Sequence, residues 1–189
     1  MISGILLAAG SASRFGGGKI AHPLADGTPV GIAAFRNLKS ALDDTLVVIR
    51  AGDSNLLSLF KAEGATVVEC ADAHLGMSRS LIAGISAAAR ANGWIVALGD
   101  MPYVKSATIR ALARALGQGA AIAIPTHAGR RGNPVGFSAA FRAQLLALSG
   151  DEGARAVVKA HAADVVEVEC EDPGILRDID TRTDIEADR

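Results

Sequence analysis

Hydrophobic residues along this chain form two kinds of pattern, short unbroken runs and stretches with helical spacing. The short runs are rich in Val, Ile and Leu, which is typical of strands buried on both faces. Strands are predicted over residues 2–8, 45–49, 65–69, 94–98, 120–124, 165–169 and 175–177. Helices are predicted over residues 30–42, 54–62, 78–91, 106–116, 139–148, 153–162 and 181–187. Because the two patterns alternate, we expect an α/β fold with a mostly parallel sheet, helices on both faces, and one domain over residues 1–189.

The alternation becomes less regular after Pro125. Residues 127–132 are polar and predict the tip of a hairpin, and we interpret the region after Pro125 as an insertion over one edge of the sheet. Ligands of open parallel sheets bind beyond the carboxyl ends of the strands. The candidate ligand-binding segments are therefore residues 9–19, 52–53, 74–80, 99–102 and 178–180.

Composition excludes several classes of protein. The 189 residues carry 19 Lys and Arg against 20 Asp and Glu, so the basic surface expected of a nucleic-acid-binding domain is absent. No apolar run approaches the roughly 20 residues of a membrane span, and the apolar N-terminal run is short and has no preceding Lys or Arg, unlike a signal peptide. Cys70 and Cys170 have neither metal-ligand spacing nor a disulfide framework, which fits inert thiols in a reducing compartment. We expect a cytoplasmic protein.

The first predicted strand runs into a glycine-rich loop, Leu7–Lys19, with the sequence LAAGSASRFGGGK. Glycines let a backbone approach a ligand closely and direct several amide groups at one spot. Arg14 and Lys19 add two positive charges. Together these features favour a triphosphate as the ligand.

Two better-known phosphate-binding loops fit this segment poorly. A Walker-type loop requires Gly and Ser or Thr where this chain has Ser13 and Ile20, so that motif fails. Residues 16–21 match the dinucleotide fingerprint, yet they begin about eight residues after the strand, and Pro23 follows almost at once. A dinucleotide-dependent oxidoreductase and a merely flexible structural loop remain as alternatives.

The pattern L-A-A-G-x-S-x-R-F-G-x-x-K resembles the signature loop of the nucleotidyltransferases that include the molybdenum cofactor cytidylyl- and guanylyltransferases. The resemblance implies a Rossmann-like fold of the nucleotide-diphospho-sugar transferase type. It implies that Arg14 and Lys19 neutralise the triphosphate as catalytic residues. It also implies a set of nucleotide-binding residues, which are Leu7, Ala8, Ala9, Gly10, Ser13 and Ser80.

Three aspartates are candidate metal ligands. Asp100 follows a hydrophobic strand and could hold a hard cation, which prefers oxygen ligands, although a turn or a helix start explains it equally well. Asp178 and Asp180 stand at i and i+2, so on an extended segment their side chains would point the same way and repel unless a cation lay between them. The resemblance implies that all three complete a magnesium site. Thr181 could equally cap the last helix.

Other segments carry a weaker resemblance. Residues 76–81 look like the cytidylyl branch, which implies that Ser80 contacts the base, while Ser78 could be the N-cap of the following helix. Ala9 also favours the cytidylyl branch, because the guanylyl branch tends to have Gly there. Asn133 stands on the acceptor side, where relatives often have His, and Asp151 is interpreted as a helix cap rather than a catalyst.

The resemblance implies transfer of CMP from CTP to a phosphorylated acceptor, molybdopterin, with release of pyrophosphate. Magnesium would be the cofactor, and a molybdoenzyme or its chaperone would be a transient partner. Two other classes stay open: the dinucleotide-dependent oxidoreductase and a non-catalytic nucleotide-binding accessory protein. The four histidines form no ligand pattern, and Ser13 has no nearby histidine base, so a serine hydrolase is not expected.

Overall fold

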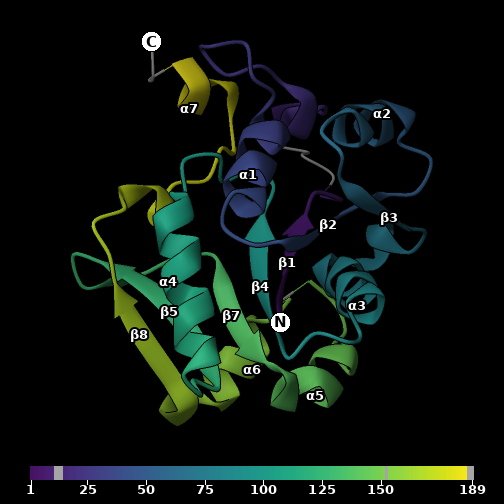
Figure 1. Cartoon of the computed structure of the whole chain (residues 1–189). Helices are drawn as coiled ribbons and strands as arrows, with labels where there is room; N and C mark the ends of the chain where they lie inside the picture. Colours follow the sequence, from purple (N-terminus) through teal and green to yellow (C-terminus); the bar gives the residue numbers. More distant parts are fainter. Residues whose placement is uncertain (11–14, 152, 187–189) are drawn as a thin grey trace.

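A mixed sheet of eight strands forms the centre of the molecule (Figure 1). The computed structural model describes residues 1–10, 15–151 and 153–186. The strand order is β3-β2-β1-β4-β7-β5-β6, and β8 pairs with β5. The strands are β1 (Ile2–Leu7), β2 (Asp44–Arg50), β3 (Thr66–Cys70), β4 (Gly93–Leu98), β5 (Ile122–His127), β6 (Arg130–Arg131), β7 (Val135–Ser138) and β8 (Val165–Glu169).

Most of the pairing is parallel, as predicted, with one interruption. Strands β1 to β4 are parallel neighbours, and β5 is parallel to β8. Strand β7 lies between β4 and β5 and is antiparallel to both. The region after Pro125 therefore enters the middle of the sheet, and the prediction of an insertion over one edge is wrong. The hairpin prediction is confirmed by the pairing of His127 with Arg130.

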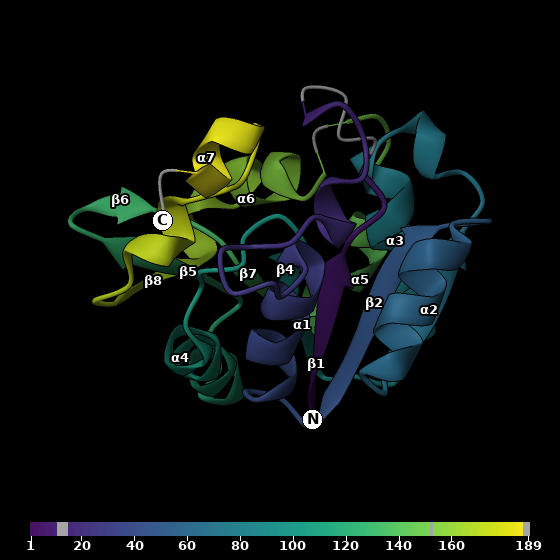
Figure 2. The same cartoon turned by 90° about the horizontal axis from the view of Figure 1, so that it is seen from above.

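Helices cover both faces of the sheet, as predicted (Figure 2). The helices are α1 (Val30–Lys39), α2 (Ser54–Ala62), α3 (Met77–Ala87), α4 (Ser106–Gly117), α5 (Arg142–Leu146), α6 (Arg155–Ala160) and α7 (Arg182–Glu186). Helices α1, α2 and α4 bury their apolar sides on one face, and α3, α5 and α6 on the other. Along β1, Leu6 joins the first core while Ile5 and Leu7 join the second, as the two-residue period of a strand requires.

The C-terminal part contains shorter elements than the sequence predicted. The predicted strand over 175–177 is wrong, because the chain forms the 3-10 helix η6 (Pro173–Leu176) there. Residues 139–141 form the separate 3-10 helix η4, so α5 is only five residues long. Shorter 3-10 helices also occur at η2 (Lys19–Ala21), η3 (Ala73–Leu75) and η5 (Ala162–Asp164).

Both cysteines are free thiols. Cys70 is buried, and Cys170 is half-buried and donates a hydrogen bond to the carbonyl of Thr126. Burial raises the pKa of the Cys170 thiol, which keeps it protonated and weakly reactive. Within the described part of the chain, no helix has the length and apolar character needed to cross a membrane.

Asp172 links η6 to the start of α4 by hydrogen bonds, and we expect its loss to destabilise the fold. The residue is 1% exposed, and its carboxylate accepts hydrogen bonds from Lys105 N (2.8 Å), Thr108 Oγ1 (2.6 Å) and Gly174 N (3.1 Å). Asp172→Ala leaves these donors unsatisfied, so we expect a loss of about 3 kcal/mol in the free energy of unfolding. Urea denaturation measures it, with the exposed neighbour variant Glu171→Ala as the control. A loss below about 1 kcal/mol would contradict this role.

Candidate active site

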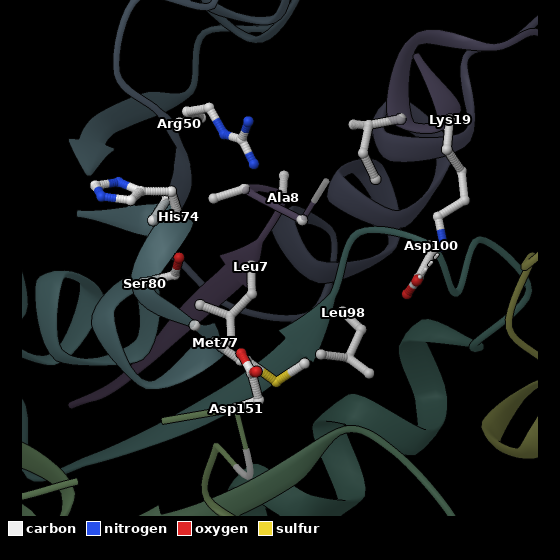
Figure 3. Close-up of a pocket in the computed structure, with 15 residues that line it drawn as sticks. Leu7, Ala8, Lys19, Arg50, His74, Met77, Ser80, Leu98, Asp100 and Asp151 are labelled. Atoms are coloured by element: carbon white, nitrogen blue, oxygen red, sulfur yellow. Dashed lines mark hydrogen bonds and ion pairs between the residues drawn. The ribbon is translucent and has the colours of Figure 1, made fainter. Parts of the chain in front are cut away.

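The carboxyl ends of β1, β2 and β4 open into a cavity of about 640 Å³ (Figure 3). This is the edge at which ligands of open parallel sheets bind. The nucleotide-binding, catalytic and metal-ligating candidates that line the cavity are Leu7, Ala8, Ala9, Gly10, Lys19, Ser80 and Asp100. The structure thus brings together residues from four separate segments of the chain. Ser13 and Arg14 lie outside the described residues.

The end of the glycine-rich loop has a backbone that only glycine adopts easily. Gly16, Gly17 and Gly18 have φ angles of 86°, 92° and 66°, in the left-handed region. Phe15, just before them, is 4% exposed and packs with Val30 and Ile179. The glycines therefore let the chain turn sharply between a buried anchor and the functional residue that follows in η2.

That functional residue, Lys19, lies between two carboxylates. Its Nζ is 2.7 Å from Asp100 Oδ2 and 3.6 Å from Asp180 Oδ1. The Lys19 side chain is 10% exposed, while those of Asp100 and Asp180 are 26% and 44% exposed, so water reaches the contact from the carboxylate side. Because both distances share one nitrogen, the two carboxylate oxygens cannot be further apart than the sum of these distances. The expected proximity of Asp100 to one of the C-terminal aspartates is thus present.

The C-terminal segment is fixed in place by backbone contacts. The amide of Ile179 donates to the carbonyl of Asp100 at 2.9 Å, and the Ile179 side chain is buried beside Phe15. Asp184 Oδ2 accepts hydrogen bonds from the amide and hydroxyl of Thr181 and from the amide of Asp180. These bonds, that of the Thr181 amide above all, hold the pKa of Asp184 below its usual value. Thr181 is the residue just before α7, and it donates hydrogen bonds to Asp184 in the first turn of that helix.

Asp178 does not join the carboxylate pair. It is exposed, and it makes no ion pair or hydrogen bond with the residues that the structure describes. Of the two aspartates that the sequence analysis paired, only Asp180 has an ion pair with Lys19 among the described contacts. In the described ranges, no three metal-ligating side chains come together. A cation held here would have Asp100 and Asp180 as its protein ligands.

The start of α3 forms another wall of the cavity and differs from the sequence interpretation. Gly76, with a φ angle of 119°, is the N-cap, and Ser78 instead donates its hydroxyl to the carbonyl of Gly150 at 2.7 Å. The interpretation of Ser78 as the N-cap is therefore wrong. Ser80 is buried and lines the cavity on the side away from Lys19 (Figure 3).

The sequence analysis passed over one charged residue of the cavity, Arg50, and gave no role to His74, which lies in a segment that it selected. Arg50, the last residue of β2, is exposed, and its guanidinium group points into the cavity toward Ala8 (Figure 3). Among the described residues, Arg50 has no ion-pair or hydrogen-bond partner. His74 is also exposed and lines the same wall as Ser80. The strand-end rule had selected the residues after β2 and so passed over the last residue of the strand itself.

A second cavity of about 640 Å³ adjoins the first. Its apolar lining includes Val96, Ile124 and Phe137, and its cationic residues include Arg155 and Lys159. Gly132 and Asn133, expected on the acceptor side, also line it.

Asp151 lines both cavities, and the interpretation of this residue as a helix cap is wrong. The N-cap of α6 is Ala154, and no side chain caps that helix.

Comparisons with known proteins agree with this architecture. Residues 4–165 match the family model of the MobA-like NTP transferase domain. The chain is 31% identical to the purine catabolism protein PucB of Bacillus subtilis (strain 168), over 94% of this chain and 91% of that protein. It is 30% identical to the nicotine blue oxidoreductase of Paenarthrobacter nicotinovorans, over 95% of this chain and 92% of that protein.

Solved structures of similar proteins share the fold of this chain. A crystal structure of the Mycobacterium tuberculosis Rv0371c homologue from Mycobacterium sp. strain JC1 is 28% identical, with a TM-score of 0.86 over 98% of this chain and 93% of that one. A manganese complex of Rv0371c from M. tuberculosis is 27% identical, with a TM-score of 0.80 over 98% of this chain and 96% of that one. The chain therefore belongs to the family of MobA-like NTP transferase domains, whose function is of the nucleotidyltransferase type.

Proposed function

We propose that this protein is a cytoplasmic enzyme that transfers CMP from CTP to a phosphorylated small-molecule acceptor, molybdopterin, and releases pyrophosphate. The observation that carries the proposal is the placement of Lys19. The glycine-rich loop brings this cation to within 2.7 Å of Asp100, at the edge of a cavity at the strand ends. Family membership supports a nucleoside triphosphate as one substrate.

The reaction requires charge neutralisation more than acid–base chemistry. A phosphate oxygen of the acceptor forms a bond to the α-phosphorus of the triphosphate, and the bond from the α-phosphorus to the bridging oxygen breaks to release pyrophosphate. The attacking phosphate is already ionised, so no strong general base is needed. The protein must instead hold two anions together against their Coulomb repulsion. Lys19 and Arg14 are the residues to which we assign this role.

The donor set suits a magnesium ion. Asp100 and Asp180 present two carboxylates within reach of one cation, and magnesium in nucleotide sites commonly takes one or two carboxylates plus phosphate oxygens and water. A bound magnesium ion would supply additional positive charge beside the phosphates. The manganese complex of Rv0371c, described above, is consistent with a divalent cation at such a site.

Arg50 gives the cavity a positive charge that the described residues do not neutralise. Lys19 is shared between Asp100 and Asp180, so these three side chains together have a net negative charge. A triphosphate needs further cations, and Arg50 lines the same cavity without a described partner. We therefore assign Arg50 to triphosphate binding, together with Arg14.

The second cavity is the proposed acceptor site. It combines an apolar lining with Arg155 and Lys159, which fits a flat organic body that carries a phosphate. Arg155 and Lys159 stand at i and i+4 on α6, so their side chains lie on one face of the helix. After transfer, a molybdoenzyme or its chaperone would receive the product.

An oxidoreductase is the second candidate, because one relative at 30% identity bears that name. A nicotinamide cofactor would have to use a fingerprint whose first glycine, Gly16, comes well after β1 ends at Leu7. Equilibrium binding of nicotinamide dinucleotides separates the candidates: tight binding of these cofactors without pyrophosphate release would favour the oxidoreductase. A non-catalytic accessory protein would bind a triphosphate and release no pyrophosphate with any acceptor.

Removal of either loop cation tests the proposed function directly. We expect Lys19→Ala and Arg14→Ala each to lower kcat for pyrophosphate release by about 10²–10³-fold, as for loss of a transition-state charge contact. Pyrophosphate release is measured with each triphosphate, with and without molybdopterin. Lys61→Ala is the matched control, since Lys61 is exposed on α2. Near-normal turnover in both loop variants would show that the triphosphate lies elsewhere.

Arg50→Ala tests the third cation. We expect KM for the triphosphate to rise about tenfold, because one charge-assisted hydrogen bond to phosphate is lost, while kcat changes less. Arg50→Lys should recover part of the affinity. Arg90→Ala, which removes an exposed arginine, is the control and should keep the normal KM. An unchanged KM in Arg50→Ala would exclude this residue from triphosphate binding.

Base choice is the third expectation. Ala9 lines the cavity, and the family's guanylyl branch tends to have Gly there, so we infer that the added methyl group disfavours the larger purine. We expect CTP to be preferred over GTP by about 10–10³-fold when equal concentrations compete for the acceptor. Ala9→Gly should narrow this ratio. Equal incorporation of both bases by the unmodified protein would mean that Ala9 does not set base choice.

A further inference from the structure

The two cavities meet at a small set of shared residues. Leu7, Met77, Leu98 and Asp151 line both, and Asp151 is the only polar residue among the described ones that do. Its carboxylate points into the junction beside Met77 and below Leu7 (Figure 3). A carboxylate at this junction would contact a bound substrate, so the substrate group beside it must be one that a carboxylate binds favourably.

Several contacts hold the Asp151 loop against α3. The carbonyl of Gly150 accepts hydrogen bonds from the hydroxyl of Ser78 at 2.7 Å and from its amide at 3.2 Å. Gly76 has no side chain, and a Cβ there would lie 2.6 Å from both Asp151 Oδ1 and the Gly150 carbonyl oxygen. The glycine thus makes room for the carboxylate, and the loop is fixed where the cavities meet.

The carboxylate has no partner of its own in the described structure. Asp151 is exposed and makes no hydrogen bond or ion pair with the described residues. The proposed function places phosphates at the Lys19 end of the first cavity and the base at the Ser80 end. The middle of a bound nucleotide, which is its ribose, would then lie over Leu7 and Leu98, next to Asp151.

Charge decides which ligand group fits. A carboxylate repels phosphates, so Asp151 would oppose the acceptor phosphate and the triphosphate alike. Ribose instead offers two neighbouring hydroxyl donors without charge, and acidic residues bind ribose hydroxyls in this way in dinucleotide-binding folds. We propose that Asp151 binds the ribose hydroxyls of the nucleotide and selects ribonucleotides over deoxyribonucleotides. This inference rests on the proposed function.

Equilibrium binding tests the inference without an acceptor. Calorimetry with magnesium compares CTP with its 2′-deoxy and 3′-deoxy analogues, for the unmodified protein and for Asp151→Ala and Asp151→Asn. We expect the unmodified protein to bind CTP about 10- to 100-fold more tightly than at least one analogue, the range for a hydrogen bond to a charged group. Asp151→Ala should bring that affinity ratio close to one. The ratio for Asp151→Asn should lie between those of the unmodified protein and Asp151→Ala. Asp43→Ala, which removes an exposed acid after α1, should keep the full ratio.

The outcomes separate the inference from the proposed function. The ratio of CTP to GTP affinity should stay unchanged in Asp151→Ala, because a general distortion of the cavity would alter base choice as well. If Asp151→Ala still binds CTP and keeps the full ratio of affinity for CTP over the deoxy analogues, the inference is overturned while the proposed function stands. Equal affinity of the unmodified protein for CTP and both deoxy analogues would also overturn the inference and leave the proposed function standing. Failure of the unmodified protein to bind any triphosphate overturns both.

Discussion

The contact of Lys19 with Asp100 and Asp180 is the constraint on which the site depends. It joins the glycine-rich loop, the end of β4 and the C-terminal segment, which are far apart in the sequence. An ion pair of this kind contributes little net stability, on the order of 1 kcal/mol or less where it is partly exposed. Most of the stabilisation comes from burial of Phe15 and Ile179 beside it, roughly 1.5–3 kcal/mol for each large apolar side chain. Apolar packing positions these segments, and the charges then face one another.

This arrangement suits a site that must accept anions. In the structure the Lys19 ammonium and its two carboxylates satisfy one another, so neither charge is left unpaired in a largely buried position. Each also has a natural second partner among the reactants: phosphate oxygens for the ammonium and a hard cation for the carboxylates. A preformed cluster of this kind lowers the reorganisation needed when the substrates bind.

The sequence correctly predicted those elements that depend on the pattern of residues close together in the chain. The buried strands and the helix over residues 54–62 follow from local composition. Strand β7 was missed because it has four residues, follows Pro134 and contains Gly136. A Cβ at Gly136 would lie 3.1 Å from Cδ1 of Ile95 and of Leu116, a tight contact that only the folded chain creates. Ser78 and Asp151 were misassigned for the same reason, since their surroundings come from distant segments.

The oxidoreductase name of one relative illustrates why function has to be argued from the site rather than from the fold. The sheet and its covering helices fix only where a ligand lies, at the strand ends. The kind of ligand depends on a few side chains at that edge. Here Lys19 with Asp100, an arginine that has no partner among the described residues, and a carboxylate at the junction of two cavities all line one cavity. In the function that we propose, these groups face the phosphates, the cation and the ribose of a nucleoside triphosphate, and the adjoining cavity with its apolar lining holds the second substrate.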